Sequence, residues 1–206
     1  MTVKKILTIS KHDKVLHTRS EPVKKINRDV KQLIEDIRDT IEANPAVGLA
    51  APQIGVLKRV MGVRLSYEAG QEKEQMSPPL ILINPEIVDQ SEETEEAEEG
   101  CLSIPGMVGL VERRLKLTVR YLDEKGKRQE RALNGWDARV VQHEIDHLDG
   151  ILYLERLKSL DDLFVLVRNE EGHLESVPYL QVKQAASVDG KPPVPAIRPA
   201  AQPRKP

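Results

Sequence analysis

Apolar residues recur at helical spacing in residues 29–44, and most positions between them are charged. The apolar members are Val30, Leu33, Ile34, Ile37 and Ile41. This period turns one apolar face toward a core and a charged face toward solvent. Pro45 lacks a backbone donor and cannot continue a helix, so the pattern predicts an N-terminal helix that ends before it.

Residues 134–150 predict a second helix. Its apolar positions are Val140, Val141, Ile145 and Leu148. Asn134 is a suitable N-cap residue, and Asp137 three positions later would complete a capping-box-like pair. Gly150 stands where a helix commonly ends in the left-handed conformation.

Four shorter segments have the apolar pattern of strands, with turn residues between them. These segments are 56–65, 80–88, 114–133 and 164–177. In the third, Leu117, Val119 and Tyr121 alternate with polar residues, and the sequence DEKG supplies a turn, which predicts an antiparallel hairpin. The fourth has the pattern of a further hairpin.

Three polar stretches separate or follow these elements. Residues 66–79 are interpreted as an exposed loop, and the acidic run 89–100 as a solvated, mobile loop. Residues 183–206 are rich in proline and poor in bulky apolar side chains, so burial cannot offset their ordering entropy and we expect a disordered tail. The remainder, residues 1–182, is predicted to form a single domain.

Composition narrows the function classes. The chain has 206 residues and a net charge of −2, without the concentrated basic face typical of nucleic-acid binding. No apolar run is long enough for a membrane span, and the opening MTVKKILTIS does not resemble an export signal. Cys101 is the single cysteine, which fits a reducing compartment. We therefore expect a cytoplasmic protein without direct nucleic-acid or membrane partners.

The stretch QHEIDHLDG carries the candidate chemistry. His143 and His147 are four residues apart, so on a helix both imidazoles lie on one face and can bind the same metal ion. Glu144 then lies beside the ion, as a general base would. Two imidazoles need at least one more ligand.

Two completions of this site remain after a third fails. A downstream histidine is excluded because Tyr153 occupies the expected position. A later glutamate would make the protein a zinc endopeptidase; the candidates are Glu155, Glu170, Glu171 and Glu175. The favoured ligand is Cys101, because a thiolate with two histidines leaves one tetrahedral position open for water, as in catalytic sites. A non-catalytic, metal-stabilised binding module is the remaining alternative.

The segments GLAAPQIG (48–55), EGCLSIP (99–105) and QHEIDHLDG (142–150) resemble, in order, the three signature motifs of peptide deformylase. The resemblance covers roughly residues 5–157. It implies an α+β fold in which antiparallel β-sheets surround a central metal-binding helix, with an N-terminal helix, so that residues 1–182 would be one catalytic domain. It also implies a hydrolase that removes the formyl group from the N-terminal formyl-methionine of newly made polypeptides and releases formate.

The resemblance also implies roles for individual residues. Cys101, His143 and His147 would hold one divalent metal ion, with Fe(II) expected and zinc, nickel or cobalt as alternatives. A metal-bound water would be the nucleophile and Glu144 the general acid/base. Gln53 and the backbone N–H of Leu102 would face the oxyanion. The residues expected to bind substrate are Val47, Gly48, Gly100 and Val140.

Further implied features lie around the site. Arg113 either pairs with Glu99 or lies on a strand surface, and Asp146 either orients a ligand or faces solvent. Nascent formyl-methionyl polypeptides would be the partners, with transient proximity to the ribosome. The region after the third motif is extended in pattern, in contrast to the long helix of many family members.

Overall fold

The computed structural model describes residues 2–66, 79–169 and 171–189. Its helices are α1 (Ile9–Leu16), α2 (Arg28–Glu42), α3 (Gly135–Asp149) and α4 (Tyr179–Asp189), with 3-10 turns η1 (Ala51–Ile54), η2 (Tyr153–Arg156) and η3 (Leu160–Asp162). Its strands are β1 (Gly48–Ala50), β2 (Val60–Val63), β3 (Leu80–Gln90), β4 (Thr94–Cys101), β5 (Ile104–Arg114), β6 (Lys116–Leu122), β7 (Arg128–Asn134), β8 (Leu163–Arg168) and β9 (Leu174–Pro178).

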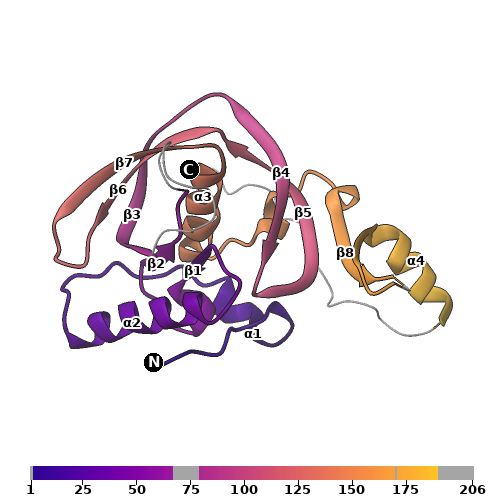
Figure 1. The fold of residues 1–206 in the computed structure, drawn as a ribbon, viewed down its shortest axis with the longest axis horizontal. Coiled ribbons are helices and arrows are strands. Elements are labelled where there is room, and N and C mark those ends of the chain that lie inside the picture. Colours follow the sequence, from indigo (N-terminus) through magenta and orange to yellow (C-terminus); the bar gives the residue numbers. More distant parts are fainter. Residues whose placement is uncertain (1, 67–78, 170, 190–206) are drawn as a thin grey trace.

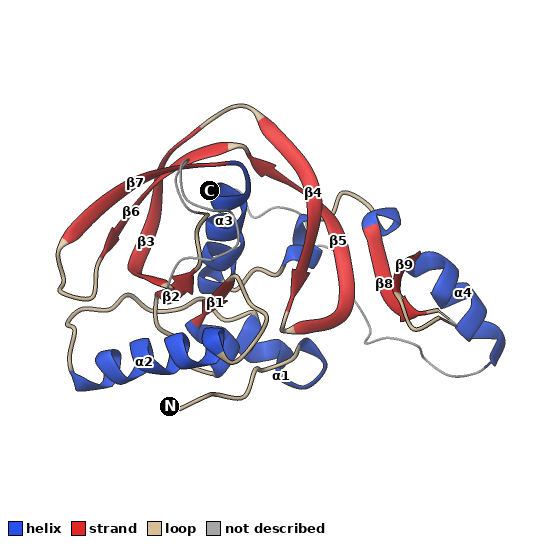
Figure 2. Cartoon of the chain, in the orientation of Figure 1, coloured by secondary structure: helices blue, strands red, loops and turns tan. Residues whose placement is uncertain are grey.

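The strands form two antiparallel sheets, one in the order β1-β2-β3-β6-β7 and the other in the order β4-β5-β8-β9. Helix α3 stands between them, while α2 lies below the first sheet and α4 lies at the far end of the second (Figure 1). Figure 2 shows the same arrangement, with helices in blue and strands in red. The expected α+β fold with a central helix is therefore confirmed.

Strand alternation distributes the core over the two faces of the first sheet. Met61, Val63 and Leu82 belong to the cluster that packs with α3, whereas Val60 and Ile81 belong to the cluster that packs with α2. Successive side chains of a strand point to opposite faces, so this short sheet can contact both helices. The first sheet thereby fixes α3 on one side and α2 on the other.

Gly62 shows how closely α2 approaches β2. A Cβ atom at this position would lie 2.7 Å from Ile41 Cδ1 and 2.9 Å from Ile37 Cγ2. Side chains of α2 fill the space that a larger residue would need, so only glycine fits without displacing the helix.

Most predicted elements are present. The helix predicted in residues 29–44 is α2, with Asn27 as its N-cap, and the hairpin predicted in 114–133 is β6–β7. The hairpin in 164–177 is β8–β9, so the extended pattern after the third motif is confirmed before the chain enters α4. Helix α4 includes positions 183–189 of the expected tail, and 190–206 lie outside the described residues.

Two local predictions are wrong. The acidic run is not a loop: from Thr94 onward it is strand β4, paired with β5 in a register that places Glu95 opposite Arg113. The negative charges of β4 are stabilised because cationic residues lie on β5 and beside it. Asn134 occupies the N-cap of α3, but its side chain makes no capping bond, and Asp137 instead accepts hydrogen bonds from Ser66 N and Oγ, both at 2.9 Å.

Two further observations complete the description. Of the predicted loop 66–79, residues 67–78 lie outside the described part of the chain. Within the described ranges, none of the helices has both the length and the apolarity that crossing a membrane requires.

Candidate active site

Helix α3 presents the two histidines of QHEIDHLDG on one face. Their ring centroids lie 5.0 Å apart with an edge-to-face arrangement. The helix ends at Gly150, which has φ 72° and lies so close to the backbone of His17 that a Cβ would be 2.7 Å from the His17 carbonyl oxygen. Glycine is required there both for the left-handed conformation and for the close contact.

Cys101 approaches these histidines from the end of β4. The β4–β5 register shifts between Gly100 and Cys101, and Cys101 Sγ lies 3.3 Å from His147 Nε2. Bulges of this kind re-aim side chains next to functional sites. One ligand atom each from Cys101, His143 and His147 lies within 4.8 Å of the others, and this is the one such group found in the described residues.

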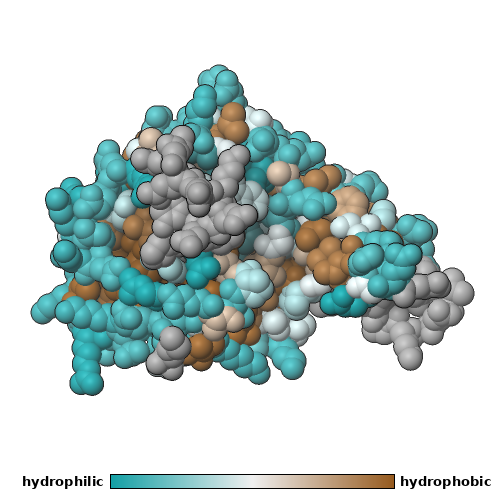
Figure 3. All heavy atoms as spheres, in the orientation of Figure 1, coloured by the Kyte–Doolittle hydropathy of each residue, from teal (hydrophilic) through white to brown (hydrophobic). Residues whose placement is uncertain are grey.

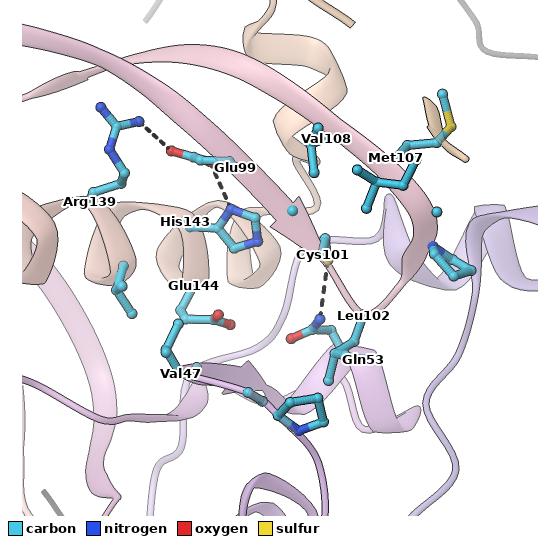
Figure 4. A pocket seen from close by; sticks show the side chains of 18 of the residues that line it. Val47, Gln53, Glu99, Cys101, Leu102, Met107, Val108, Arg139, His143 and Glu144 are labelled. Atoms are coloured by element: carbon cyan, nitrogen blue, oxygen red, sulfur yellow. Dashed lines mark hydrogen bonds and ion pairs between the residues drawn. The ribbon is translucent and has the colours of Figure 1, made fainter. Parts of the chain in front are cut away.

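Glu99 holds the His143 ring in place. His143 Nδ1 donates to Glu99 Oε2 at 2.9 Å, which leaves Nε2 to face the cluster. Arg139 Nη1 donates to Glu99 Oε1 at 2.9 Å (Figure 4). Arg113 donates to both carboxylate oxygens of Glu99, each at 2.9 Å. Burial acts to raise the pKa of Glu99, but the hydrogen bonds from Arg113 and His143 outweigh it and lower the pKa well below its ordinary value.

The two histidines titrate differently. Burial acts to lower the pKa of His143, but hydrogen bonds to Cys101 and Glu99 raise it well above its ordinary value. Burial and the charge of His143 lower the pKa of His147. His147 Nδ1 is buried and has no hydrogen-bond partner among the described residues. The site therefore favours one added positive charge, and a thiolate with two imidazoles is a donor set that divalent metals bind.

Glu144 lies beside this cluster in a buried position. Its side chain is buried, and burial raises its pKa to about 7. Oε2 has no hydrogen-bond partner among the described residues, and a Cβ added to Gly48 would lie 2.4 Å from Oε1. The carboxyl group is thus confined against the backbone of β1 and can exchange a proton near neutral pH.

Gln53 reaches the site from η1. Its Oε1 accepts the backbone N–H of Ala50 at 2.8 Å, which directs Nε2 toward Cys101 Sγ at 3.5 Å and Ser103 Oγ at 3.3 Å. Leu102 lies next to the Gln53 amide (Figure 4). The amide orientation is therefore set by the turn itself, and its donor points into the pocket.

A cavity of about 420 Å³ joins these groups. Of the predicted residues, nine line it: Val47, Gly48, Gln53, Gly100, Cys101, Leu102, Val140, His143 and Glu144. His147 lies behind this lining, against Cys101. The structure thus brings all ten predicted site residues together around one pocket.

Sequence reasoning missed several lining residues, among them Trp136, Arg139, Val108 and Leu166. Arg139 is buried and donates to the backbone oxygens of Glu95 and Val111 as well as to Glu99. An arginine on the core-facing side of a predicted helix was a usable signal for such a role. Leu166 had no local signal, because only the pairing of distant strands places it at the pocket.

The glutamates that a zinc endopeptidase would use are occupied elsewhere. Glu155 Oε1 lies 2.8 Å from His17 Nε2, and Glu175 Oε1 accepts from Asn169 Nδ2 at 2.6 Å. Glu171 lies 3.5 Å from His173, and Glu170 is outside the described residues. No described glutamate joins the cluster of Cys101 and the two histidines.

The alternatives for Arg113 are also decided, and Asp146 does not face solvent, although its hydrogen-bond partners are Arg113 and Arg156 rather than a ligand histidine. Arg113 is buried rather than on a strand surface, and it bridges Glu99 to Asp146. Asp146 is also buried and accepts from Arg156 as well. These charges link the helix face behind the site to β4 and β5.

Residues 3–162 match the family described as polypeptide deformylase. A curated relative, the peptide deformylase of Desulforudis audaxviator, is 46% identical over 148 residues, which are 72% of this chain and 90% of the relative.

Solved structures are similar over comparable lengths. A peptide deformylase from Synechococcus elongatus in complex with actinonin has a TM-score of 0.71 at 31% identity and covers 97% of this chain and 92% of its own. A Met-Ala-Ser bound structure of a class I type b peptide deformylase from Acinetobacter baumannii has a TM-score of 0.68 at 34% identity, covering 76% of this chain and 100% of its own.

Proposed function

The chain belongs to the peptide deformylase family, a family of enzymes, and we propose that it is the metal-dependent hydrolase that removes the formyl group from the N-terminal formyl-methionine of newly made polypeptides. The observation that carries this proposal is the convergence of Cys101, His143 and His147 on one point, with Glu144 and Gln53 in the same pocket.

Cys101, His143 and His147 would hold one divalent cation. The short separations of their ligand atoms, with His147 Nε2 only 3.3 Å from Cys101 Sγ, support this fit. When bound, the cation supplies Lewis acidity, which polarises the formyl oxygen and acidifies water. We propose Fe(II) as the native metal, with zinc, nickel or cobalt able to occupy the same donors, because this ligand set accepts several metals.

Glu144 would be the general acid/base. Its carboxylate accepts the proton of the attacking water and then donates it to the departing amine, which converts a poor leaving group into a neutral N-terminus. A pKa of about 7 suits both roles, because the group then accepts and releases a proton at similar cost at neutral pH. Confinement against Gly48 keeps the carboxylate in one position through both steps.

Gln53 and Leu102 would stabilise the charge that develops on the formyl oxygen. Gln53 Nε2 is held as a donor by the bond between its Oε1 and Ala50 N, and it can exchange its long contacts with sulfur and Ser103 for a shorter bond to an oxyanion. The Leu102 backbone N–H would be the second donor. Donors aimed in advance at the developing charge commonly contribute about 10²–10³ in rate.

The substrate would enter as an extended strand between two sheet edges. β1 and β4 are edge strands of the two sheets, and Gly48 and Gly100 on them let a backbone approach closely. Val47 and Val140 line the apolar part of the pocket and would contact the methionine side chain. The relative solved with Met-Ala-Ser bound supports a peptide that begins with methionine. Such a substrate places the enzyme in the cytoplasm and, transiently, near the ribosome.

Formate release from a formyl-Met peptide by the metal-loaded protein is the direct test. Glu144→Gln should lower kcat by about 10²–10⁴, while the metal content stays the same. Glu171→Gln, an exposed glutamate outside the pocket, is the matched control and should keep full activity. Absence of formate release by the metal-loaded parent protein would refute the proposed function.

Cys101→Ser distinguishes the deformylase hypothesis from the zinc endopeptidase hypothesis. Loss of bound metal in Cys101→Ser, with retention in Glu155→Gln, is the expected result. The reverse pattern would assign the third ligand to the later glutamate.

A further inference from the structure

One side of the pocket, the outer wall, is formed by β5 and β8. Val108 on β5 and Leu166 on β8 both line the cavity. β8 begins directly after residues 3–162, the part of the chain that matches the family, so Leu166 comes from outside that match. Figure 4 shows Val108 and Met107 across Cys101 from Glu144.

The outer wall continues into a strip of apolar side chains on the sheet surface. Val108 pairs with Phe164, so the two side chains lie on the same face. Residues two positions along a strand share that face. The resulting apolar strip consists of Val108, Leu110, Phe164 and Leu166. All four are only partly buried, and Figure 3 shows hydrophobic atoms gathered where β5 and β8 lie.

The apolar strip is not part of the folding core. The opposite face of the same strands carries Val111 and Leu163, which are both fully buried. The second sheet therefore has a core face that explains its stability, and its other face carries the apolar strip, which is bordered by Glu98 opposite Leu110 and by Glu112 farther along β5. Contiguous apolar surface that folding does not require commonly marks a binding site.

The position of the strip identifies its ligand. Val108 and Leu166 belong both to the strip and to the pocket, so a chain that leaves the pocket on this side meets the strip without a gap. Gly100, directly opposite Val108 on β4, has no side chain to interrupt this path. In an extended peptide, side chains two positions apart project to the same side about 7 Å apart, which matches the spacing of Val108 and Leu110 along β5.

We propose that the apolar strip binds alternate side chains of the segment that follows the formyl-methionine, so that this enzyme favours nascent chains with aliphatic residues at those positions. The inference rests on the proposed function, because the deformylase reaction places the start of the peptide in the pocket. Charged or small polar residues at the same positions gain no contact with the strip and are accepted with lower affinity.

Matched peptides test the preference in the metal-loaded parent enzyme. We expect kcat/KM for formyl-Met-Leu-Leu-Leu to exceed that for formyl-Met-Ser-Ser-Ser about tenfold, mainly through KM, because the contact is equal in the ground and transition states. Single Leu substitutions at each position locate the effect. Equal values for all peptides overturn this inference and leave the deformylase function intact, whereas no formate from any peptide overturns the function.

Variants assign the preference to the strip. Leu166→Ser and Phe164→Ser should lower kcat/KM for the Leu peptide about fivefold more than for the Ser peptide. Leu174→Ser is the matched control, because Leu174 is 59% exposed on β9 and does not line the pocket. A preference that survives both strip variants overturns the assignment.

Trp136 provides a binding readout that does not depend on turnover. It is the single tryptophan, it lines the pocket and it is 50% exposed, so peptide binding should change its fluorescence. Titration of the metal-loaded parent protein with these deformylated peptides should give about tenfold tighter binding of Met-Leu-Leu-Leu than of Met-Ser-Ser-Ser. Equal affinities overturn the proposal, and this measurement on the parent stands even if a strip variant does not fold.

Discussion

On the inner wall of the pocket, where α3 meets the end of β4, the charged side chains of Glu99, Arg113, Arg139 and Asp146 are buried together. On the outer wall, Val108 and Leu166 are apolar, partly exposed and free of ionic contacts. Each inner-wall charge depends on its neighbours, since a buried ion without a partner is costly. Outer-wall residues are uncharged and need no such partner. Substitutions there can therefore alter substrate preference, whereas substitution of an inner-wall charge leaves its partner buried and unpaired.

Glu99→Ala tests the inner wall most severely. It leaves the guanidinium groups of Arg113 and Arg139 buried without their shared carboxylate and removes the acceptor of His143 Nδ1. We expect the free energy of unfolding in denaturant to fall by about 3–5 kcal/mol, with loss of metal affinity. Glu96→Ala, an exposed glutamate of the same strand paired with Lys158, should change stability by less than about 0.5 kcal/mol. Similar losses for both would remove the distinction between buried and exposed charges.

Gly48→Ala tests crowding at the inner wall rather than charge. The added methyl group would occupy the space of the Glu144 carboxyl, whose Cδ would be 2.8 Å from the new Cβ. Displacement of a catalytic group by about 1 Å commonly costs about 10² in rate, so formate release should fall by that factor while metal content is retained. Gly62→Ala, whose Cβ would crowd Ile41 and Ile37 of α2 rather than Glu144, controls for the stability cost of a crowded methyl group. Full activity of Gly48→Ala would show that Glu144 can move without loss.

Features that depend on local sequence were predictable, whereas features that depend on distant partners were not. α2, the β6–β7 hairpin and the ten site residues depend on periodicity and on motifs that lie within a few residues of each other. β4 was missed because Glu95, Glu96 and Glu98 look like a solvated run until the partner strand is known. Pairing with β5 places Arg113 opposite Glu95, and Lys158, from the segment between η2 and η3, forms an ion pair with Glu96; both partners are distant in sequence from the acidic run.

The outer wall was unpredictable for a related reason. Leu166 alternates in an ordinary strand pattern, and its place at the pocket depends on pairing between β8 and β5, whose residues are far apart in sequence. Asp137 was assigned to a cap by position, but Ser66 offers it two donors and therefore competes successfully. In both cases, contacts with residues distant in sequence determine the position or the hydrogen bonds of the side chain.

Tyr153 joins the two walls and tests whether the inner wall tolerates an unsatisfied group. Its ring stacks on His143 with centroids 6.3 Å apart, and a Cβ on Gly109 of β5 would be 2.9 Å from its Cε2. The hydroxyl is buried and has no partner among the described residues. Tyr153→Phe should therefore keep the free energy of unfolding or raise it by about 1 kcal/mol. A loss above about 1 kcal/mol in denaturant unfolding would mean that the hydroxyl has a hydrogen-bond partner.

The ion pair of His17 with Glu155, in η2 behind the outer wall, should have the smallest effect. The hydrogen bond that His17 donates to Glu155 raises the pKa of His17 from 6.5 to about 8. Because the folded-state value is the higher one, the protonated form stabilises the fold fully below pH 6.5, and this contribution is lost as pH rises through about 8. The shift corresponds to about 2 kcal/mol unscreened, but His17 is one-third exposed, so we expect less than about 1 kcal/mol. Unfolding free energies of the parent and Glu155→Gln, measured between pH 6 and pH 9, should converge at the upper end. A difference that grows with pH would contradict both the pairing and its sign.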